Sequence, residues 1–241
     1  MMSSMLAMPR RGHLDNLFQI FSYLKKYHNA EMLFDPSLPD VNMNDFVRND
    51  WTASEQMKYE EELPGNMIPP RGIGFRMTVY VDADNAGDTI TRRIRTGFIV
   101  FLNKSPIYWL SKKQNSPVLC ETDSSSFGSE FMAMKHCCEY VRRGLRIKLR
   151  LMGIPCEEPT FIYGDNQSVL CNLARPDSTL KQKSNSIAYH FVVREGAAKD
   201  EWRTAYINTN ENPTDLFTKM LVAGKREHFI WMLLNYIFRT E

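Results

Sequence analysis

Three short apolar segments, separated by short connections, constrain the fold of this chain more than any other feature. In the first, Met77, Val79 and Val81 alternate with other residues, which is typical of a strand with one buried face. Residues 97–102 and 106–110 are compact apolar runs that predict two further strands. Only a few residues separate these two runs, as in a hairpin. We therefore expect an antiparallel meander.

A long amphipathic helix is predicted after the meander. Its apolar positions recur every three or four residues over 131–152, and Gly153 and Pro155 end it. Residues 160–163 then predict a short buried strand, which leads into a helix over 167–174. A strand that is reached through a helix usually runs parallel to an earlier strand of the same sheet. We therefore expect the first and fourth strands to be parallel.

The rest of the C-terminal half continues this alternation of helices and strands. The pattern predicts helices over 186–194, 214–220 and 225–238, and a strand over 202–207. The order of elements is typical of an α/β fold with a mixed sheet.

The N-terminal third has a different sequence pattern. Apolar residues at helical spacing predict a helix over 14–24, and a short apolar run predicts a strand over 32–34. This piece is too small to hold a core. Residues 35–71 contain five prolines and an acidic run at 60–62, which predicts a linker or an irregular surface arm. We therefore divide the chain into three parts: 1–34, an acidic, proline-containing linker over 35–72, and an α/β domain over 73–241.

Composition excludes several classes of protein. The chain has 241 residues, of which 43% are hydrophobic and 24% charged, so it is neither disordered nor fibrous. No stretch approaches the roughly 20 apolar residues of a membrane-spanning helix, and the N-terminus does not read as a secretory signal. The five cysteines include no CxxC pair, which predicts buried thiols in a reducing compartment.

The net charge is only +2, but bases predominate in 73–241 and acids in 1–72. A mildly basic domain can bind polyanions. Arg92 and Arg93 lie in the first hairpin, and Lys112 and Lys113 follow the third strand; they are either solvated charges or contacts to a nucleic acid backbone. We interpret three further arginines on one face of the long helix as solvated rather than as a phosphate track: Arg142, Arg146 and Arg150.

Four acidic residues stand where predicted strands end and helices begin. Asp82 and Asp165 close two strands, and Glu130 and Asp215 open two helices. Each of them alone is a common choice for a turn or a helix cap. If the sheet brings the first and fourth strands side by side, the four carboxylates can meet, and their repulsion then requires neutralisation. Divalent cations such as Mg²⁺, with oxygen ligands, are the usual solution.

Six ordered sequence blocks carry a resemblance to a known family. The blocks are YVDADNAGD (80–88), TRRIRTG (91–97), PIYWLSKKQ (106–114), SSFGSEFMA (125–133), YGDNQS (163–168) and NPTDLFTK (212–219). The series is similar to the RNase H domain of copia-type LTR retrotransposon polyproteins and covers residues 73–241. Residues 7–34 resemble the tail of the reverse transcriptase region that lies just upstream in such polyproteins, so 1–34 is expected to be a remnant of it.

The resemblance implies a type 1 RNase H fold, which is a five-stranded mixed sheet flanked by helices, here with a small N-terminal helix–strand extension. It implies a metal-dependent endonuclease that hydrolyses the RNA strand of RNA–DNA hybrids. Asp82, Glu130, Asp165 and Asp215 would then be the catalytic ligands of two Mg²⁺ ions, or of Mn²⁺. The other expected partner is the rest of the polyprotein, and no contact with a membrane is expected. The expected location is the cytoplasm, within a virus-like particle, or the nucleus.

One departure from the family pattern and two alternative functions qualify this expectation. Many type 1 RNases H carry a histidine in the loop before the last aspartate, and residues 208–214 contain none, which could slow turnover. A degenerate, inactive copy that only binds nucleic acid is the main alternative, and a DDE-type transposase acting on duplex DNA is another.

Asn166 and Gln167 either contact the minor groove or cap the helix that follows. Asn166 also stands where a polymerase Tyr-x-Asp-Asp turn needs a carboxylate, so polymerase activity is not expected.

Overall fold

The computed structural model describes residues 8–52, 61, 63–84, 94–114, 126–176 and 194–236. The chain divides into two compact units. The smaller unit combines Met1–Leu33 with Ile230–Glu241, and the larger one comprises Phe34–Phe229. The sheet and the acidic residues singled out above lie in the larger unit.

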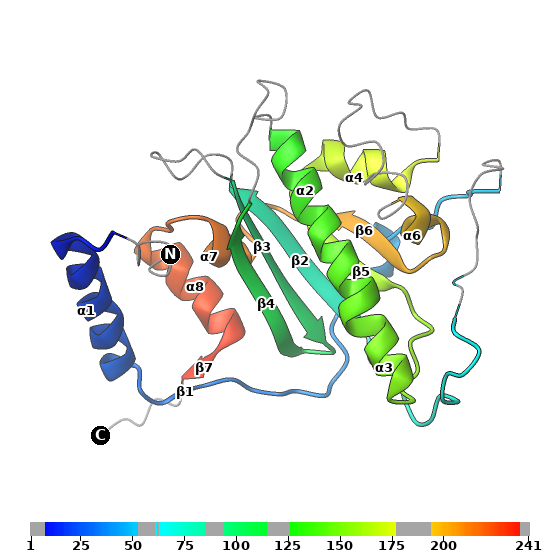
Figure 1. Ribbon diagram of the computed structural model, residues 1–241, viewed down its shortest axis with the longest axis horizontal. Coiled ribbons are helices and arrows are strands. Elements are labelled where there is room, and N and C mark those ends of the chain that lie inside the picture. Colours follow the sequence, from blue (N-terminus) through cyan, green and yellow to red (C-terminus); the bar gives the residue numbers. More distant parts are fainter. Residues whose placement is uncertain are drawn as a thin grey trace. The chain divides into compact units, whose positions relative to one another are not determined.

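The larger unit is built on a five-stranded mixed sheet with strand order β4-β3-β2-β5-β6 (Figure 1). The strands β2, β3 and β4 pair antiparallel, and β2, β5 and β6 pair parallel. This topology confirms the predicted meander and the predicted parallel pairing of the first and fourth strands. The bounds are β2 Met77–Asp84, β3 Arg95–Leu102, β4 Ser105–Lys113, β5 Thr160–Gly164 and β6 Trp202–Tyr206.

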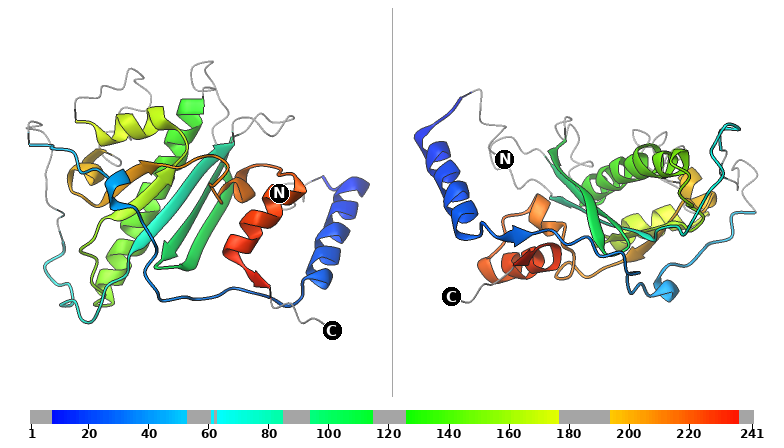
Figure 2. Two further views of the ribbon diagram at one scale, coloured as in Figure 1. Left: turned by 180° about the vertical axis from the view of Figure 1, so that it is seen from behind. Right: turned by 90° about the horizontal axis from the view of Figure 1, so that it is seen from below.

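One continuous helix covers a face of this sheet (Figure 2). It comprises α2 (Ser126–Glu139), a π-helical segment η3 (Tyr140–Arg146) and α3 (Ile147–Leu151). The predicted helix is confirmed, although its pattern did not reveal the π-helical segment. The helix ends at Leu151, just before Gly153, which the sequence predicts as its terminator and whose φ of 76° suits glycine. The N–H of Gly153 donates to Arg150 O and the N–H of Ile154 to Leu149 O, which is a Schellman motif.

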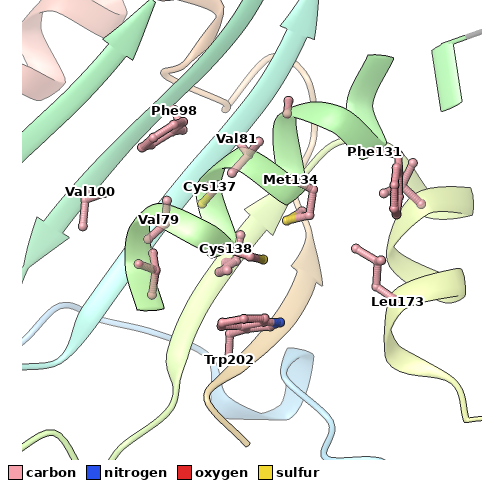
Figure 3. Packing of buried hydrophobic residues seen from close by; sticks show 14 of the residues in the cluster. Val79, Val81, Phe98, Val100, Phe131, Met134, Cys137, Cys138, Leu173 and Trp202 are labelled. Atoms are coloured by element: carbon pink, nitrogen blue, oxygen red, sulfur yellow. The ribbon is translucent and has the colours of Figure 1, made fainter. Parts of the chain in front are cut away.

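The main core lies between this helix and the sheet (Figure 3). Alternate residues of β2 and β3, such as Val81 and Phe98, point into it, as the period of a strand requires. The helix α4 (Gln167–Ala174) closes the same core with Leu173. Cys137 and Cys138 are fully buried free thiols, as predicted, and burial raises the pKa of both. Two further free cysteines depart from that prediction: Cys156 is half-buried and Cys171 exposed.

The opposite face of the sheet is covered in part by the segment before β2. Phe46, next to the short 3₁₀ helix η2 (Met43–Asp45), is only 1% exposed. Its ring centroid lies 4.9 Å from that of Phe161 and 4.9 Å from that of Tyr163. Apart from η2, the described part of 35–72 has no helix or strand, and it contributes an aromatic anchor to the sheet.

The three arginines of the long helix are not a solvated face, so that interpretation is wrong. Arg142 Nε lies 2.5 Å from Glu201 Oε2, and Arg146 is only 3% exposed. Arg150 forms an ion pair with Glu61 of the N-terminal segment. These guanidinium groups are bound by carboxylates and backbone carbonyls of the chain itself, which also argues against a phosphate track.

The remaining elements are short or belong to the smaller unit. In the larger unit α6 (Glu195–Ala198) precedes β6, and α7 (Asp215–Thr218) follows it. In the smaller unit α1 (Arg11–Lys26) is followed by β1 (Ala30–Glu31), which pairs antiparallel with β7 (Asn235–Tyr236). The helix α8 (Ala223–Leu233) spans the boundary between the units.

Two sequence-based boundaries are wrong, and one lies outside the described residues. The early strand occupies Ala30–Glu31 rather than 32–34, and the terminal helix ends at Leu233, because the chain then extends to form β7. Of the predicted helix over 186–194, the structure describes only Arg194. Among the described residues, we find no helix with the length and hydropathy needed to cross a bilayer.

Gly196 provides a test of this packing. A Cβ atom at this position would lie 2.1 Å from the ring of Trp202, which is buried in the core. We expect Gly196→Ala to lower the free energy of unfolding by about 1–3 kcal/mol, because the ring must move in a packed interior. Chemical denaturation measures this change. Gly224→Ala is the matched control: a Cβ there meets open space, so stability should be unchanged or slightly higher, and equal effects of both substitutions would contradict the packing.

Candidate active site

Asp82 is a fully buried carboxylate near the end of β2. It is 0% exposed, and it lies on the face of β2 opposite to Val81, where α7 packs (Figure 2). The hydroxyl of Thr218 donates to its Oδ2, and Lys219 Nζ lies 3.0 Å from its Oδ1. Burial raises the pKa of Asp82 to about 6, although Lys219 and Thr218 lower it.

Glu130 comes from the first turns of α2 and is 9% exposed. Its carboxylate accepts a hydrogen bond from the backbone N–H of Ala83, directly beside Asp82. Burial raises the pKa of Glu130 to about 9, and repulsion by Asp82 and Asp165 adds to the shift. Burial is the main reason that this carboxylate resists ionisation, and the neighbouring acids strengthen the effect.

Asp165 follows directly on β5 and is half-buried. The hydroxyl of Thr209 donates to its Oδ2 over 3.1 Å. The next residue, Asn166, caps α4 by accepting a hydrogen bond from the N–H of Val169 over 3.2 Å. The helix that follows Asp165 agrees with the expectation that this turn is not a polymerase hairpin.

Three acids from three separate elements meet at one edge of the sheet. Because β2 and β5 are parallel neighbours, Asp82 and Asp165 end their strands side by side, and α2 brings Glu130 over the same edge. One oxygen from each carboxylate lies within 4.8 Å of the others. Opposite ligands of a Mg²⁺ ion lie about 4.2 Å apart, since each Mg–O bond is about 2.1 Å. The spread of up to 4.8 Å is slightly wider than this, so a small inward rotation of the side chains would let the three carboxylates hold one hard divalent cation.

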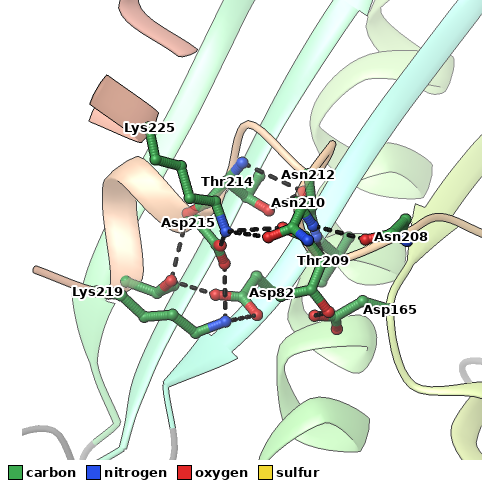
Figure 4. A network of polar contacts seen from close by, with 12 residues as sticks. Asp82, Asp165, Asn208, Thr209, Asn210, Asn212, Thr214, Asp215, Lys219 and Lys225 are labelled. Carbon is green, nitrogen blue, oxygen red and sulfur yellow. Dashed lines mark hydrogen bonds and ion pairs between the residues drawn. The ribbon is translucent and has the colours of Figure 1, made fainter. Parts of the chain in front are cut away.

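The fourth predicted acid, Asp215, is not one of the three clustered carboxylates and is paired with two lysines (Figure 4). It begins α7 and is 1% exposed. Its Oδ1 lies 2.7 Å from Lys219 Nζ, and its Oδ2 lies 2.7 Å from Lys225 Nζ. Lys219 therefore bridges Asp82 and Asp215. Attraction to Asp82 and hydrogen bonds to both carboxylates outweigh the effect of burial and raise the pKa of Lys219.

The position of α7 depends on close contact with the sheet. Gly97, which is paired with Asp82 on β3, has no side chain, and a Cβ there would lie 2.5 Å from Thr218 Cγ2. The hydroxyl of Ser111 on β4 donates to Phe217 O over 2.6 Å. Asn212, which precedes α7, donates to Val81 O over 3.0 Å. These contacts fix the backbone from which Asp215 and Lys219 extend.

An open cavity of about 650 Å³ adjoins the acids. Asn166 and Gln167 both line it, together with Asp84 and Tyr206. Lys112 and Lys113, at the end of β4, are absent from its described lining. Arg92 and Arg93 lie outside the described residues.

Sequence reasoning missed the lysines and hydroxyls that surround the acids. Lys219 stands four residues after Asp215, and this spacing places two helical side chains together, so the signal was present within the NPTDLFTK block. Thr209, in the loop that lacks a histidine, binds Asp165. We find no sequence signal that singles out Lys225, which reaches Asp215 from another helix.

Comparison with known proteins is consistent with this arrangement. The retrovirus-related Pol polyprotein from transposon RE2 of Arabidopsis thaliana is 29% identical over 186 residues, which is 74% of this chain and 12% of that protein. The Pol polyprotein from transposon TNT 1-94 of Nicotiana tabacum is 28% identical over 172 residues, 71% of this chain and 12% of that protein.

The homologues of this chain are Pol polyproteins of copia-type transposons. They confirm the resemblance that the six sequence blocks carry. The chain spans only about a tenth of the length of these curated relatives. No family model matches the sequence.

Solved RNase H structures are similar to part of this chain. LC11-RNase H1, isolated from compost, is 11% identical with a TM-score of 0.45, covering 59% of this chain and 92% of its own. RNase H1 from the halophilic archaeon Halobacterium salinarum is 12% identical with a TM-score of 0.42, covering 59% and 94%. The strand order of the sheet confirms the expected fold, a five-stranded mixed sheet flanked by helices.

The raised pKa of Glu130 predicts a pH-dependent stability. Its folded pKa of about 9 exceeds the ordinary 4.5, so its contribution to stability is full below pH 4.5 and is lost as the pH rises toward 9. Without divalent ions, Glu130→Gln should gain stability relative to the unsubstituted chain between pH 4 and 8, by about 1 kcal/mol or more at pH 8. Thermal unfolding in EDTA measures the gain as about 2–4 °C.

The control for this prediction is Glu227→Gln. Glu227 lies on α8 and is exposed, so removing its charge should change stability little at either pH. A Glu130→Gln effect that is the same at pH 4 and pH 8 would contradict the described electrostatics of the cluster.

Proposed function

We propose that this chain is a metal-dependent hydrolase of the RNase H type, which cuts the RNA strand of RNA–DNA hybrids as part of a retrotransposon polyprotein. The convergence of Asp82, Glu130 and Asp165 within 4.8 Å carries the proposal. The similarity to retrovirus-related Pol polyproteins of transposons supports it. One solved neighbour, LC11-RNase H1, was crystallised with an RNA/DNA hybrid.

The three acids would hold a divalent cation, Mg²⁺ or Mn²⁺, through one oxygen each. When bound, such an ion lowers the pKa of a coordinated water and stabilises charge on the phosphate and the leaving oxygen. Asp82 and Asp165 would be shared by two ions if both were present. The predicted ligand role of Asp215 requires that its oxygens first exchange their lysine partners for a cation.

The surrounding residues hold these acids in place. Thr218 donates to Asp82, Thr209 donates to Asp165, and the N–H of Ala83 donates to Glu130. These donors fix the direction of the carboxylates before a ligand arrives, which lowers the cost of organising the site. The open cavity beside them, which Glu130 and Asp165 line, is where a phosphate of the hybrid would lie.

The groups proposed to contact the hybrid surround this cavity only in part. Gln167 lines the cavity and is exposed to solvent. Its amide group could therefore contact a minor-groove edge or a 2′-hydroxyl of the hybrid. Asn166 uses its Oδ1 as a helix cap, so any contact that it makes with the hybrid is limited to its remaining polar atoms. Lys112 and Lys113, with Arg92 and Arg93, remain proposed contacts to the phosphate backbone.

The domain assignment and the location of the protein are also proposals. Residues 1–34 would derive from the end of the reverse transcriptase region, 35–72 would link it to the nuclease domain, and 73–241 would form that domain. A hybrid substrate would place the chain in a cytoplasmic virus-like particle or in the nucleus.

A cleavage assay tests the proposed function. We expect the purified chain to cut labelled RNA in a hybrid with Mg²⁺ and not in EDTA. Asp165→Asn should lower the rate by at least about 100-fold, because an amide removes one anionic ligand while keeping the shape of the side chain. Gel analysis of the labelled strand measures the rate.

The matched control is Asp200→Asn. Asp200 pairs with Arg203 and has a φ of 55°, which asparagine also tolerates, so cleavage should stay within about 2-fold. Binding of hybrid without any cleavage would reject the enzyme and favour the inactive copy. Cleavage of duplex DNA instead of hybrid would favour the transposase alternative.

A further inference from the structure

The ammonium group of Lys219 lies where two buried carboxylates face each other (Figure 4). Its Nζ is 3.0 Å from Asp82 Oδ1 and 2.7 Å from Asp215 Oδ1. Asp82 and Asp215 are 0% and 1% exposed, so water contributes little to screening their repulsion. Lys219 is therefore the cation that holds this pair of acids together.

The place of Lys219 is built into the fold. It follows Thr218, which is 2% exposed and donates to Asp82. It is the residue directly after α7, and its backbone N–H donates to Asp215 O over 2.9 Å. The helix α7 itself packs against Gly97 at a distance no larger residue allows. The ammonium group therefore extends from a fixed backbone rather than from a solvated loop.

The charges of the cluster leave room for one divalent ion. The four carboxylates, when ionised, carry four negative charges: those of Asp82, Glu130, Asp165 and Asp215. The ammonium groups of Lys219 and Lys225 offset two of them. Once a bound cation has ionised Glu130, the two charges that remain match one Mg²⁺ or Mn²⁺ ion at the triad. A second divalent ion between Asp82 and Asp215 would meet Lys219 at contact distance, and like charges repel strongly there.

We propose that Lys219 takes the place of a second divalent cation between Asp82 and Asp215, so that this domain binds one divalent ion, at the triad of Asp82, Glu130 and Asp165. In this arrangement Asp215 is a positioning residue that holds Lys219 against Asp82. The inference rests on the proposed function for its catalytic meaning. The binding of the ion, however, is measured without substrate.

Counting bound Mn²⁺ tests the proposal. Isothermal titration calorimetry and electron paramagnetic resonance, with Mn²⁺ alone, should give one ion per chain. Lys219→Met should admit a second ion, with an affinity at least about tenfold higher than any second binding to the unsubstituted chain. Lys219→Arg keeps the charge and should again bind one ion.

The matched control is Lys225→Met. It removes an ammonium group that touches Asp215 but not Asp82, so the count should remain one. Circular dichroism verifies that each variant is folded. If Lys219→Met does not fold, the count for the unsubstituted chain and for Lys219→Arg still decides. Two ions of similar affinity in the unsubstituted chain, no bound ion, or a count unchanged in folded Lys219→Met would overturn the proposal.

The two proposals fail in different ways. A chain that follows the Mn²⁺ pattern but never cuts hybrid refutes the proposed function and leaves the role of Lys219 intact. A chain that cuts hybrid but binds two Mn²⁺ ions of similar affinity refutes the role of Lys219 and leaves the proposed function intact.

Discussion

Mutual repulsion among buried carboxylates constrains the structure at the acidic edge, the end of β2 and β5 where Asp82, Glu130, Asp165 and Asp215 lie. Asp82 and Asp215 are almost completely buried, and Glu130 is 9% exposed, so the solvent cannot offset their charges. Two lysines form ion pairs with these carboxylates, and the hydroxyl groups of Thr218 and Thr209 donate hydrogen bonds to Asp82 and Asp165. Burial raises the pKa of Glu130, and repulsion by Asp82 and Asp165 adds to the shift. A site of this kind gains from binding a cation and is less stable without one.

The sheet topology brings these groups together despite their separation along the chain. Parallel pairing of β2 and β5 places Asp82 next to Asp165, and the long helix returns over the sheet to add Glu130. On the other face, the missing side chain of Gly97 lets α7 approach, which brings in Asp215 and Lys219. The acids therefore meet on a rigid scaffold of strands and helix ends, which is suited to a preorganised site.

Much of this arrangement can be predicted from the sequence, because it follows from local patterns. Alternation in Met77–Asp84 and the helical period of 131–152 indicate the elements, and their order implies the parallel pair. The partners of charged groups are harder to predict. Arg146 is buried against backbone carbonyls, although a row of arginines at helical spacing usually indicates a solvated face. Lys219 was readable as a neighbour of Asp215, but its contact with Asp82 depends on how closely α7 packs on the sheet.

Anomalous diffraction from crystals grown with Mn²⁺ would locate the cation itself. We expect one strong peak within bonding distance of oxygens from Asp82, Glu130 and Asp165, with the side chain of Lys219 still between Asp82 and Asp215. A map without a peak at these three carboxylates, in crystals that contain Mn²⁺ at millimolar concentration, would show that the acidic edge is not a cation site.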